Sequence, residues 1–313
     1  TSYDLFTCAS ATEANNWLFY SLFQTSDLVK EPPRVIISAI EHACVSQPLL
    51  HYAEQGLIDL QVCRVTSEGI IDLDHFDSLL TPTTTLVSVI LANNEIGTIQ
   101  PLAVLAEKAH RVGAIVHSDI VQAAGKIPIN CIDLGIDIAV LSSHKCYAPT
   151  GCGVLLVRDS NLLKPMLFGG SQQQKLRAGT VNAMGLHLFA IGLTYCYNAL
   201  PTHLDVHSWA TALCRSHKAL SLLFPLSLET CLWNTVPMVI SDHLAHDAMM
   251  RLDMMGVAIS TGSACSTGAV ETSPTIQALG ISDAVANSVV RLSFGYPTTP
   301  HDLTTISAAF DQF

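Results

Sequence analysis

The feature that most constrains the fold is a regular alternation of short apolar runs with helix-like stretches along the first two thirds of the chain. The apolar runs are rich in β-branched residues, and the stretches between them have a helical period. This alternation is typical of a mostly parallel sheet that is covered on both faces. We therefore predict an α/β fold in which helices sandwich such a sheet. The predicted strands are residues 35–38, 59–62, 85–91, 114–117, 136–141 and 153–157, and the predicted helices between them are 14–23, 43–54 and 102–112.

A smaller α/β lobe is predicted after Pro201, which ends a helix expected at 181–200. We expect a large domain at residues 1–200 and a small C-terminal domain at 201–313. The lobe's predicted elements are a helical stretch at 204–223, a strand at 238–241, a helix at 245–255, strands at 257–260 and 289–294, and a final helix at 300–313.

Composition excludes several classes of protein. The net charge is −11, from 15 basic and 26 acidic residues, and no basic run occurs, so we expect no nucleic-acid partner. No apolar stretch reaches the length of a membrane span, and the first residues lack the pattern of a secretion signal. The ten cysteines include no C-x-x-C pair, so we expect free thiols and no metal site. A cytoplasmic location follows, or an organelle matrix in a eukaryote.

Lys145 is the first candidate for chemistry, because Ser142-Ser143-His144-Lys145 follows a buried strand. A lysine beside an apolar wall is costly as a charged amine, and a Schiff base with an aldehyde cofactor removes that cost. Taken alone, the tetrapeptide fits an ordinary surface lysine in a loop better than it fits a cofactor lysine.

Two other segments would suit such a cofactor. Asp119 follows the strand at 114–117 and could hold a pyridinium nitrogen protonated, with Gln122 close to the ring hydroxyl; a helix N-cap is the alternative for Asp119. Residues 10–16 read as a small-residue turn leading into a helix, a pattern that favours phosphate binding. A capping box of Ser10 and Glu13 explains the same pattern.

Cys265 lies in a run of small residues at 260–268, where a thiol has little to pack against and would be accessible. It has the strongest claim to reactivity among the ten cysteines. Arg291 is a charge inside an apolar strand and needs an anionic partner. That partner could be a substrate carboxylate or a structural Asp or Glu.

Taken together, these segments resemble the cysteine desulfurases, pyridoxal-phosphate (PLP) enzymes of fold type I in the class V aminotransferase group. The motifs occur in the family's order. They are Asn93–Gly97, His117–Gln122, Ser142–Lys145 with Tyr147-Ala148-Pro149, Arg177–Thr180, and Gly262–Cys265 with Glu271-Thr272-Ser273-Pro274.

The resemblance implies a role for each site residue. Lys145 forms the Schiff base and moves protons, and Cys265 takes the sulfur of L-cysteine as a persulfide, leaving alanine. Arg291 holds the substrate carboxylate. The other roles concern the cofactor: Asp119 pairs with the ring nitrogen, and Gln122 bonds near the ring oxygen. His42 stacks on the ring and is also expected to be catalytic, and Asn94 bonds near the ring oxygen and is also expected to bind substrate. The phosphate is bound by Ala11, Thr12, Ser142 and His144, with Thr180 from a second subunit of a homodimer.

The resemblance also implies a sulfur-acceptor protein, in iron–sulfur cluster assembly or thiolation. The chain departs from the family's pattern in lacking an N-terminal segment of several dozen residues, and in having Val181 where Glu is usual and Thr272 where Pro is usual. The alternatives are a selenocysteine lyase, another class V PLP enzyme, or an inactive truncated subunit. An aminotransferase would need no thiol at Cys265.

Overall fold

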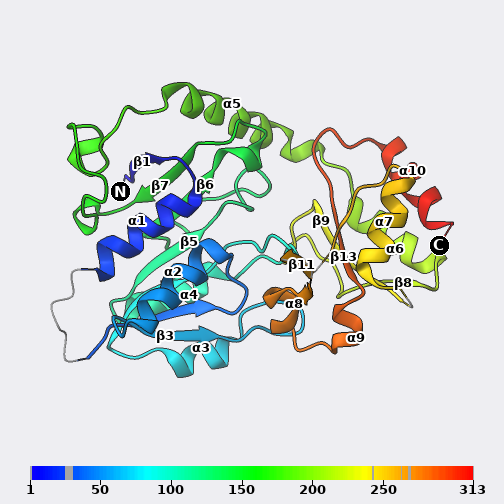
Figure 1. Cartoon of the computed structure of the whole chain (residues 1–313), viewed down its shortest axis with the longest axis horizontal. Helices are drawn as coiled ribbons and strands as arrows, with labels where there is room; N and C mark the ends of the chain where they lie inside the picture. The colour runs from blue at the N-terminus through cyan, green and yellow to red at the C-terminus, as the bar shows by residue number, and fades with distance from the viewer. Residues whose placement is uncertain (1, 25–30, 242, 262, 267–268, 313) are drawn as a thin grey trace. The chain divides into compact units, whose positions relative to one another are not determined.

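The computed structural model describes residues 2–24, 31–241, 243–261, 263–266 and 269–312, and for 263–266 and 269–271 the backbone alone. The chain forms two compact units (Figure 1). The first comprises residues 1–64, 71–92 and 100–198; the second comprises 65–70, 93–99 and 199–313. Two short segments from the first hundred residues, 65–70 and 93–99, thus belong to the second unit. The expected division at residue 200 assigned both segments to the first domain.

The first unit is built on a seven-stranded sheet with the strand order β1-β7-β6-β5-β4-β2-β3. Strands β3, β2, β4, β5 and β6 run parallel, whereas β7 and β1 are antiparallel to their neighbours. The predicted mostly parallel sheet is therefore confirmed. The strands are β1 Asp4–Cys8, β2 Arg34–Ser38, β3 Asp59–Cys63, β4 Thr84–Ser88, β5 Ile115–Asp119, β6 Ile138–Ser142 and β7 Gly153–Val157.

Helices cover this sheet because its strands are apolar on both faces. Val35 and Ile37 of β2 belong to a core cluster with residues of α1 and α2, so by alternation Ile36, also fully buried, faces the opposite side. Helices α1 and α2 lie side by side over the sheet in Figure 1. The helices of this unit are α1 Ala11–Phe23, α2 Ala43–Glu54, α3 Leu73–Leu79, α4 Leu102–Arg111 and α5 Ala183–Ala199, with 3₁₀ turns η1 Ser143–Cys146, η2 Ser160–Leu162 and η3 Gln173–Lys175.

The second unit contains a four-stranded antiparallel sheet with the order β10-β13-β9-β8 and a separate hairpin, β11–β12. Its strands are β8 Leu220–Leu222, β9 Thr235–Ile240, β10 Ser260–Thr261, β11 Ser263–Ser266, β12 Ala269–Thr272 and β13 Val289–Ser293. Its helices are η4 Leu200–Thr202, α6 Val206–Ser216, α7 Ala245–Met254, α8 Pro274–Ala278, α9 Asp283–Ala286 and α10 Pro300–Phe310.

Two details of this unit differ from the sequence expectation. Residues 220–222 form the edge strand β8, whereas we predicted that the preceding helix runs to residue 223. The helix ends at Ser216, and Leu220 then packs into the hydrophobic core of this unit. The expected strand at 257–260 is also displaced, since β10 comprises Ser260 and Thr261.

No helix in the described ranges is both long enough and apolar enough to cross a membrane.

Candidate active site

Lys145 lies in the turn η1, directly after strand β6. Helix α5 holds this turn closely: a Cβ atom at Gly192 would lie 2.2 Å from the carbonyl oxygen of Cys146, so only glycine fits there. The next residue, Tyr147, has a φ of 58°, a left-handed conformation that a non-glycine residue adopts at some cost in free energy. The backbone on both sides of Lys145 is thus firmly placed.

The side chain of Lys145 is exposed. The expected burial beside an apolar wall is therefore wrong for the single chain, because the turn carries the side chain away from the buried strand. An exposed amine on a fixed turn leaves room for a covalent partner.

Asp119 ends strand β5, the neighbour of β6 in the sheet, and is 3% exposed. Its Oδ1 accepts the backbone N–H of Val121 at 2.9 Å, and its Oδ2 accepts the thiol of Cys44 at 3.5 Å. Burial raises the pKa of this carboxyl, while the N–H of Val121 and the nearby His42 act in the opposite direction. No α-helix begins at Asp119, so the N-cap alternative is wrong. A buried carboxylate at the carboxyl end of a strand is suited to a cationic ring nitrogen.

The groups predicted to bind phosphate meet where β6, β7 and helix α1 begin or end. Ser142 at the end of β6 lies opposite Gly153, and its hydroxyl is 2.9 Å from Nδ1 of His144. A Cβ atom at Gly153 would come within 2.9 Å of the backbone N of Ala11, the first residue of α1. Ser142, His144 and the N-terminus of α1, which carries Thr12, are thereby brought together. The exposed N–H groups of a helix start and these side chains are the donors that a phosphate needs.

The capping alternative for residues 10–16 is partly correct. The hydroxyl of Ser10 accepts the N–H of Glu13 at 3.1 Å. Glu13, however, uses one carboxylate oxygen to accept the N–H of Ala9 and pairs through the other with Arg177. This ion pair, which sequence reasoning missed, ties the loop before α5 to the start of α1.

His42 caps helix α2, with Nδ1 accepting the N–H of Cys44 at 3.1 Å, and its side chain is exposed. The preceding residue, Glu41, links strand β2 to the end of β4: its Oε1 accepts the hydroxyl of Ser38 and the N–H of Ile90. Its Oε2 is buried and has no hydrogen-bond partner among the residues that the structure describes, and burial raises the pKa of Glu41 to about 8. Sequence reasoning noted Glu41 but assigned it no role.

Gln122 and Thr180 are less well defined as site residues. The side-chain carbonyl of Gln122 accepts from Nζ of Lys126 at 2.8 Å, so its amide N–H₂ is the group that could bond a ring hydroxyl. Thr180 is exposed after the positive-φ residue Gly179.

In the second unit, Arg291 of β13 donates from Nη1 to the backbone oxygen of Asn94 at 2.7 Å and from Nη2 to the hydroxyl of Ser260 at 3.0 Å. Its Nε is buried and has no partner in the described ranges, and burial lowers the pKa of the guanidinium. Across the described residues no carboxylate lies within 4.0 Å of Arg291. The structural salt bridge considered from sequence is not found in that part of the chain. Asn94 contacts Arg291 through its backbone oxygen. This contact does not support the role at the cofactor that we expected for the Asn94 side chain.

Cys265 lies in strand β11, opposite Val270 of β12. The prediction of a plain loop is wrong here, since the backbone forms a hairpin. The thiol itself lies outside what the structure describes.

Cys44 is the site residue that sequence reasoning missed. Its Sγ, a nitrogen of His42 and an oxygen of Asp119 lie within 4.8 Å of one another. These are donor types that metals also use, but Asp119 and Cys44 already bond to each other and to neighbours. We therefore interpret the group as a set of hydrogen-bonding side chains around Asp119. Nothing in the sequence distinguished Cys44 from the other buried thiols.

Comparison with known proteins agrees with this arrangement. Residues 2–306 match the family model of the aminotransferase class-V proteins. A cysteine desulfurase of Gluconacetobacter diazotrophicus is 32% identical over 305 residues, which make up 95% of this chain and 74% of that protein. The cysteine desulfurase IscS of Dictyoglomus turgidum is 31% identical over 302 residues, 94% of this chain and 75% of that protein. This chain belongs to the cysteine desulfurases of the class-V aminotransferase family.

Solved structures place the cysteine desulfurase chain in the same fold. A NifS-like protein superposes with a TM-score of 0.88 at 26% identity, over 98% of this chain and 81% of that one. SspA, solved in complex with cysteine, gives a TM-score of 0.76 at 27% identity, over 93% of this chain and 81% of that one. The predicted α/β fold and family are therefore confirmed.

Proposed function

We propose that this chain binds PLP through Lys145 and transfers sulfur from L-cysteine to Cys265, releasing alanine. The thiol of Cys265 bonds to the substrate sulfur as the carbon–sulfur bond of cysteine breaks, so one cysteine and one thiol give one alanine and one persulfide. The observation that carries the proposal is that Asp119 ends β5 and Lys145 follows β6, so both lie at the carboxyl ends of neighbouring parallel strands. In parallel sheets, ligands bind at the carboxyl ends of the strands.

The residues present fit the cofactor. The close approach of Gly153 to the start of α1, with Ser142 and His144 beside it, provides donors for a phosphate. The buried carboxylate of Asp119 suits a protonated ring nitrogen, and the exposed Lys145 suits an aldehyde. When bound, PLP withdraws electrons from the substrate carbons.

The chain's own groups supply the remaining chemistry. Asp119 would hold the proton on the ring nitrogen, and the face of His42 would orient the ring. Lys145 would move a proton at the substrate Cα. Arg291, already positioned by Asn94 and Ser260, would receive the substrate carboxylate at its buried, unpartnered Nε. Gln122 and Thr12 would add hydrogen bonds at the ring hydroxyl and the phosphate.

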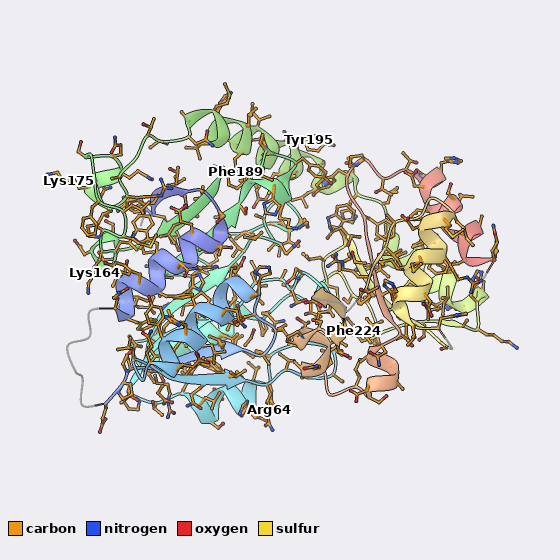
Figure 2. All side chains as sticks on the ribbon, viewed as in Figure 1. Arg64, Lys164, Lys175, Phe189, Tyr195 and Phe224 are labelled. Atoms are coloured by element: carbon orange, nitrogen blue, oxygen red, sulfur yellow. The ribbon has the colours of Figure 1, made fainter. Side chains whose placement is uncertain are left out.

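We also propose that the functional form is a homodimer in which Thr180 reaches the phosphate of the second subunit. An apolar strip on α5 supports this: Met184, Ile191 and Tyr195 are 68%, 52% and 47% exposed, and Tyr147 beside Tyr195 is 53% exposed. Figure 2 labels Tyr195 and the buried Phe189, both on α5. An exposed strip of this kind is suited to a second copy. Sedimentation of the purified chain tests this, with Ile191→Arg expected to yield monomer.

A persulfide must pass its sulfur on, so the proposal includes an acceptor with a nucleophilic thiol, such as a protein of iron–sulfur cluster assembly or of a thiolation pathway. A reducing compartment such as the cytoplasm is supported by the nine free cysteines among the described residues. Related cysteine desulfurases carry the descriptions mitochondrial, in Eremothecium gossypii, and mitosomal, in Trachipleistophora hominis.

The test is alanine and sulfide production from L-cysteine by the PLP-treated chain with a reductant. We expect a yellow protein that forms both products. Lys145→Ala should lose the colour, and Cys265→Ser should keep the colour but form no sulfide. A colourless wild-type protein, or a Cys265→Ser variant as active as wild type, would contradict the proposal.

A further inference from the structure

The carboxylate of Asp119 is held by a row of hydrogen-bond donors that reaches back into helix α1. Asn15, on α1, donates from Nδ2 to Sγ of Cys44 at 3.2 Å, and the Cys44 thiol donates to Oδ2 of Asp119 at 3.5 Å. All three side chains are buried, with 0%, 7% and 3% exposure. Because they are buried, these side chains rely on protein groups for their hydrogen bonds, and Cys44 bonds to both of the others.

The direction of these bonds is what gives them an effect on Asp119. A thiol can accept one hydrogen bond and donate another, and here it accepts from an amide and donates to a carboxylate. Both donors point toward Asp119, so each bond strengthens the next. Val121 holds the other oxygen, Oδ1, from the opposite side. As far as the structure describes the chain, each carboxylate oxygen thus has one protein donor and keeps a free lone pair.

We propose that Cys44 and Asn15 are positioning residues that keep Asp119 ionised and correctly oriented for the cofactor's ring nitrogen. This inference rests on the proposed use of PLP. It gives a role to a cysteine that otherwise counts as core packing.

Protonation of Cys44 is consistent with this role. Burial and the neighbouring Asp119 raise the pKa of the thiol, so at neutral pH it carries the proton that it donates. The same bond lowers the pKa of Asp119 and so opposes part of the effect of burial. The other titratable groups nearby are His42, whose charge lowers the pKa of Asp119, and Glu41, which in its ionised form raises the pKa of Cys44.

The experiment titrates PLP into the cofactor-free chain and measures its dissociation constant by the rise of the yellow band. Cys44→Ala removes the donor and should weaken PLP binding about fivefold, the effect of one hydrogen bond from a weak donor. Cys44→Ser keeps a donor of similar size and should stay within about twofold of wild type. Cys63→Ala is the matched control, because Cys63 is a fully buried thiol of the same unit whose hydrogen bonds, within the described part of the chain, go to the backbone carbonyls of Arg64 and Asp72.

Two further readouts separate positioning from packing. In the loaded protein, Cys44→Ala should raise the pH at which the yellow form bleaches, because a less protonated ring nitrogen withdraws less charge; Cys63→Ala should not move it. Asn15→Ala should weaken PLP binding about twofold in the wild type and have no further effect in the Cys44→Ala background.

The outcomes are distinct. PLP binding and bleaching pH in Cys44→Ala equal to those of wild type would overturn the inference, and so would equal losses in Cys44→Ala and Cys44→Ser, which would indicate packing alone. Failure of the proposed function is recognised separately, since the wild type itself would then bind no more PLP than Lys145→Ala. Thermal unfolding of each variant without cofactor shows whether it is folded.

Discussion

Replacing Glu41 with glutamine tests whether a neutral acid lies buried beside Asp119. The Oε1 atom of Glu41 accepts hydrogen bonds from Ser38 and Ile90, but Oε2 is buried without a partner. Burial is the largest cause of its raised pKa of about 8, and the charge of Asp119 adds to it. Glutamine keeps the shape and the accepting oxygen but cannot ionise.

The sign of the effect follows from proton binding. In the unfolded chain this carboxyl loses its proton near its ordinary pKa of 4.5, whereas the folded protein retains it up to about pH 8. Between these values the folded state binds more protons, so the contribution of Glu41 to the free energy of unfolding falls as the pH rises. The slope is at most about 1.4 kcal/mol per pH unit, or about 3 kcal/mol between pH 5 and pH 7.

Urea unfolding of the wild type and of Glu41→Gln at pH 5, 6, 7 and 8 measures this difference. The variant should be equal to wild type or slightly less stable at pH 5, because its amide N–H₂ finds no acceptor, and it should become the more stable protein as the pH rises. Glu54→Gln, which changes an exposed glutamate at the end of α2, controls for the loss of a charge. A constant stability difference between Glu41→Gln and wild type across this pH range would refute the buried neutral acid.

Two other substitutions test the placement of substrate and cofactor. Arg291→Lys should raise KM for L-cysteine about tenfold or more with a smaller effect on kcat, because an ammonium group cannot replace the planar fork at Asn94 and Ser260; unchanged steady-state kinetics would remove Arg291 from the site. Gly192→Ala should force the turn at Cys146 to move and lower PLP occupancy by absorbance, while Thr194→Ala on the exposed side of the same helix should not; full occupancy in Gly192→Ala would show that the turn adapts.

The parallel sheet could be predicted because its strands carry a direct signal. Strands such as β2 and β6 are continuous apolar runs, and that pattern reports burial on both faces. The hairpin β11–β12 could not be predicted, since its Ser, Thr, Ala and Gly residues show no apolar alternation. The edge strand β8 could not be predicted for a different reason. Its leucines continue the helical spacing of α6, so the sequence fits a longer helix, and only tertiary packing favours the strand.

The positions of the candidate site residues could be inferred where a polar residue follows a strand, as for Asp119 and Lys145. Contacts between segments that are distant in the sequence have no comparable sequence signal. Cys44 and Asp119 are 75 residues apart, and Glu13 and Arg177 are 164 apart, so neither pair is visible without the fold. The exposure of Lys145 was missed for a third reason, because it depends on a 3₁₀ turn whose shape is set by a glycine 47 residues later on α5.

The assignment of residues 65–70 and 93–99 to the second unit affects the order in which the protein can form during translation. Ile96 is completely buried in a cluster with Phe224, Ile276 and Val289, all of which leave the ribosome more than a hundred residues later. In a nascent chain whose parallel sheet has already formed, Ile96 therefore cannot be buried in this cluster until these later residues have been synthesised. The second unit can therefore be completed only after residue 289 has been synthesised, and a fragment that starts at residue 199 would lack part of its own interior.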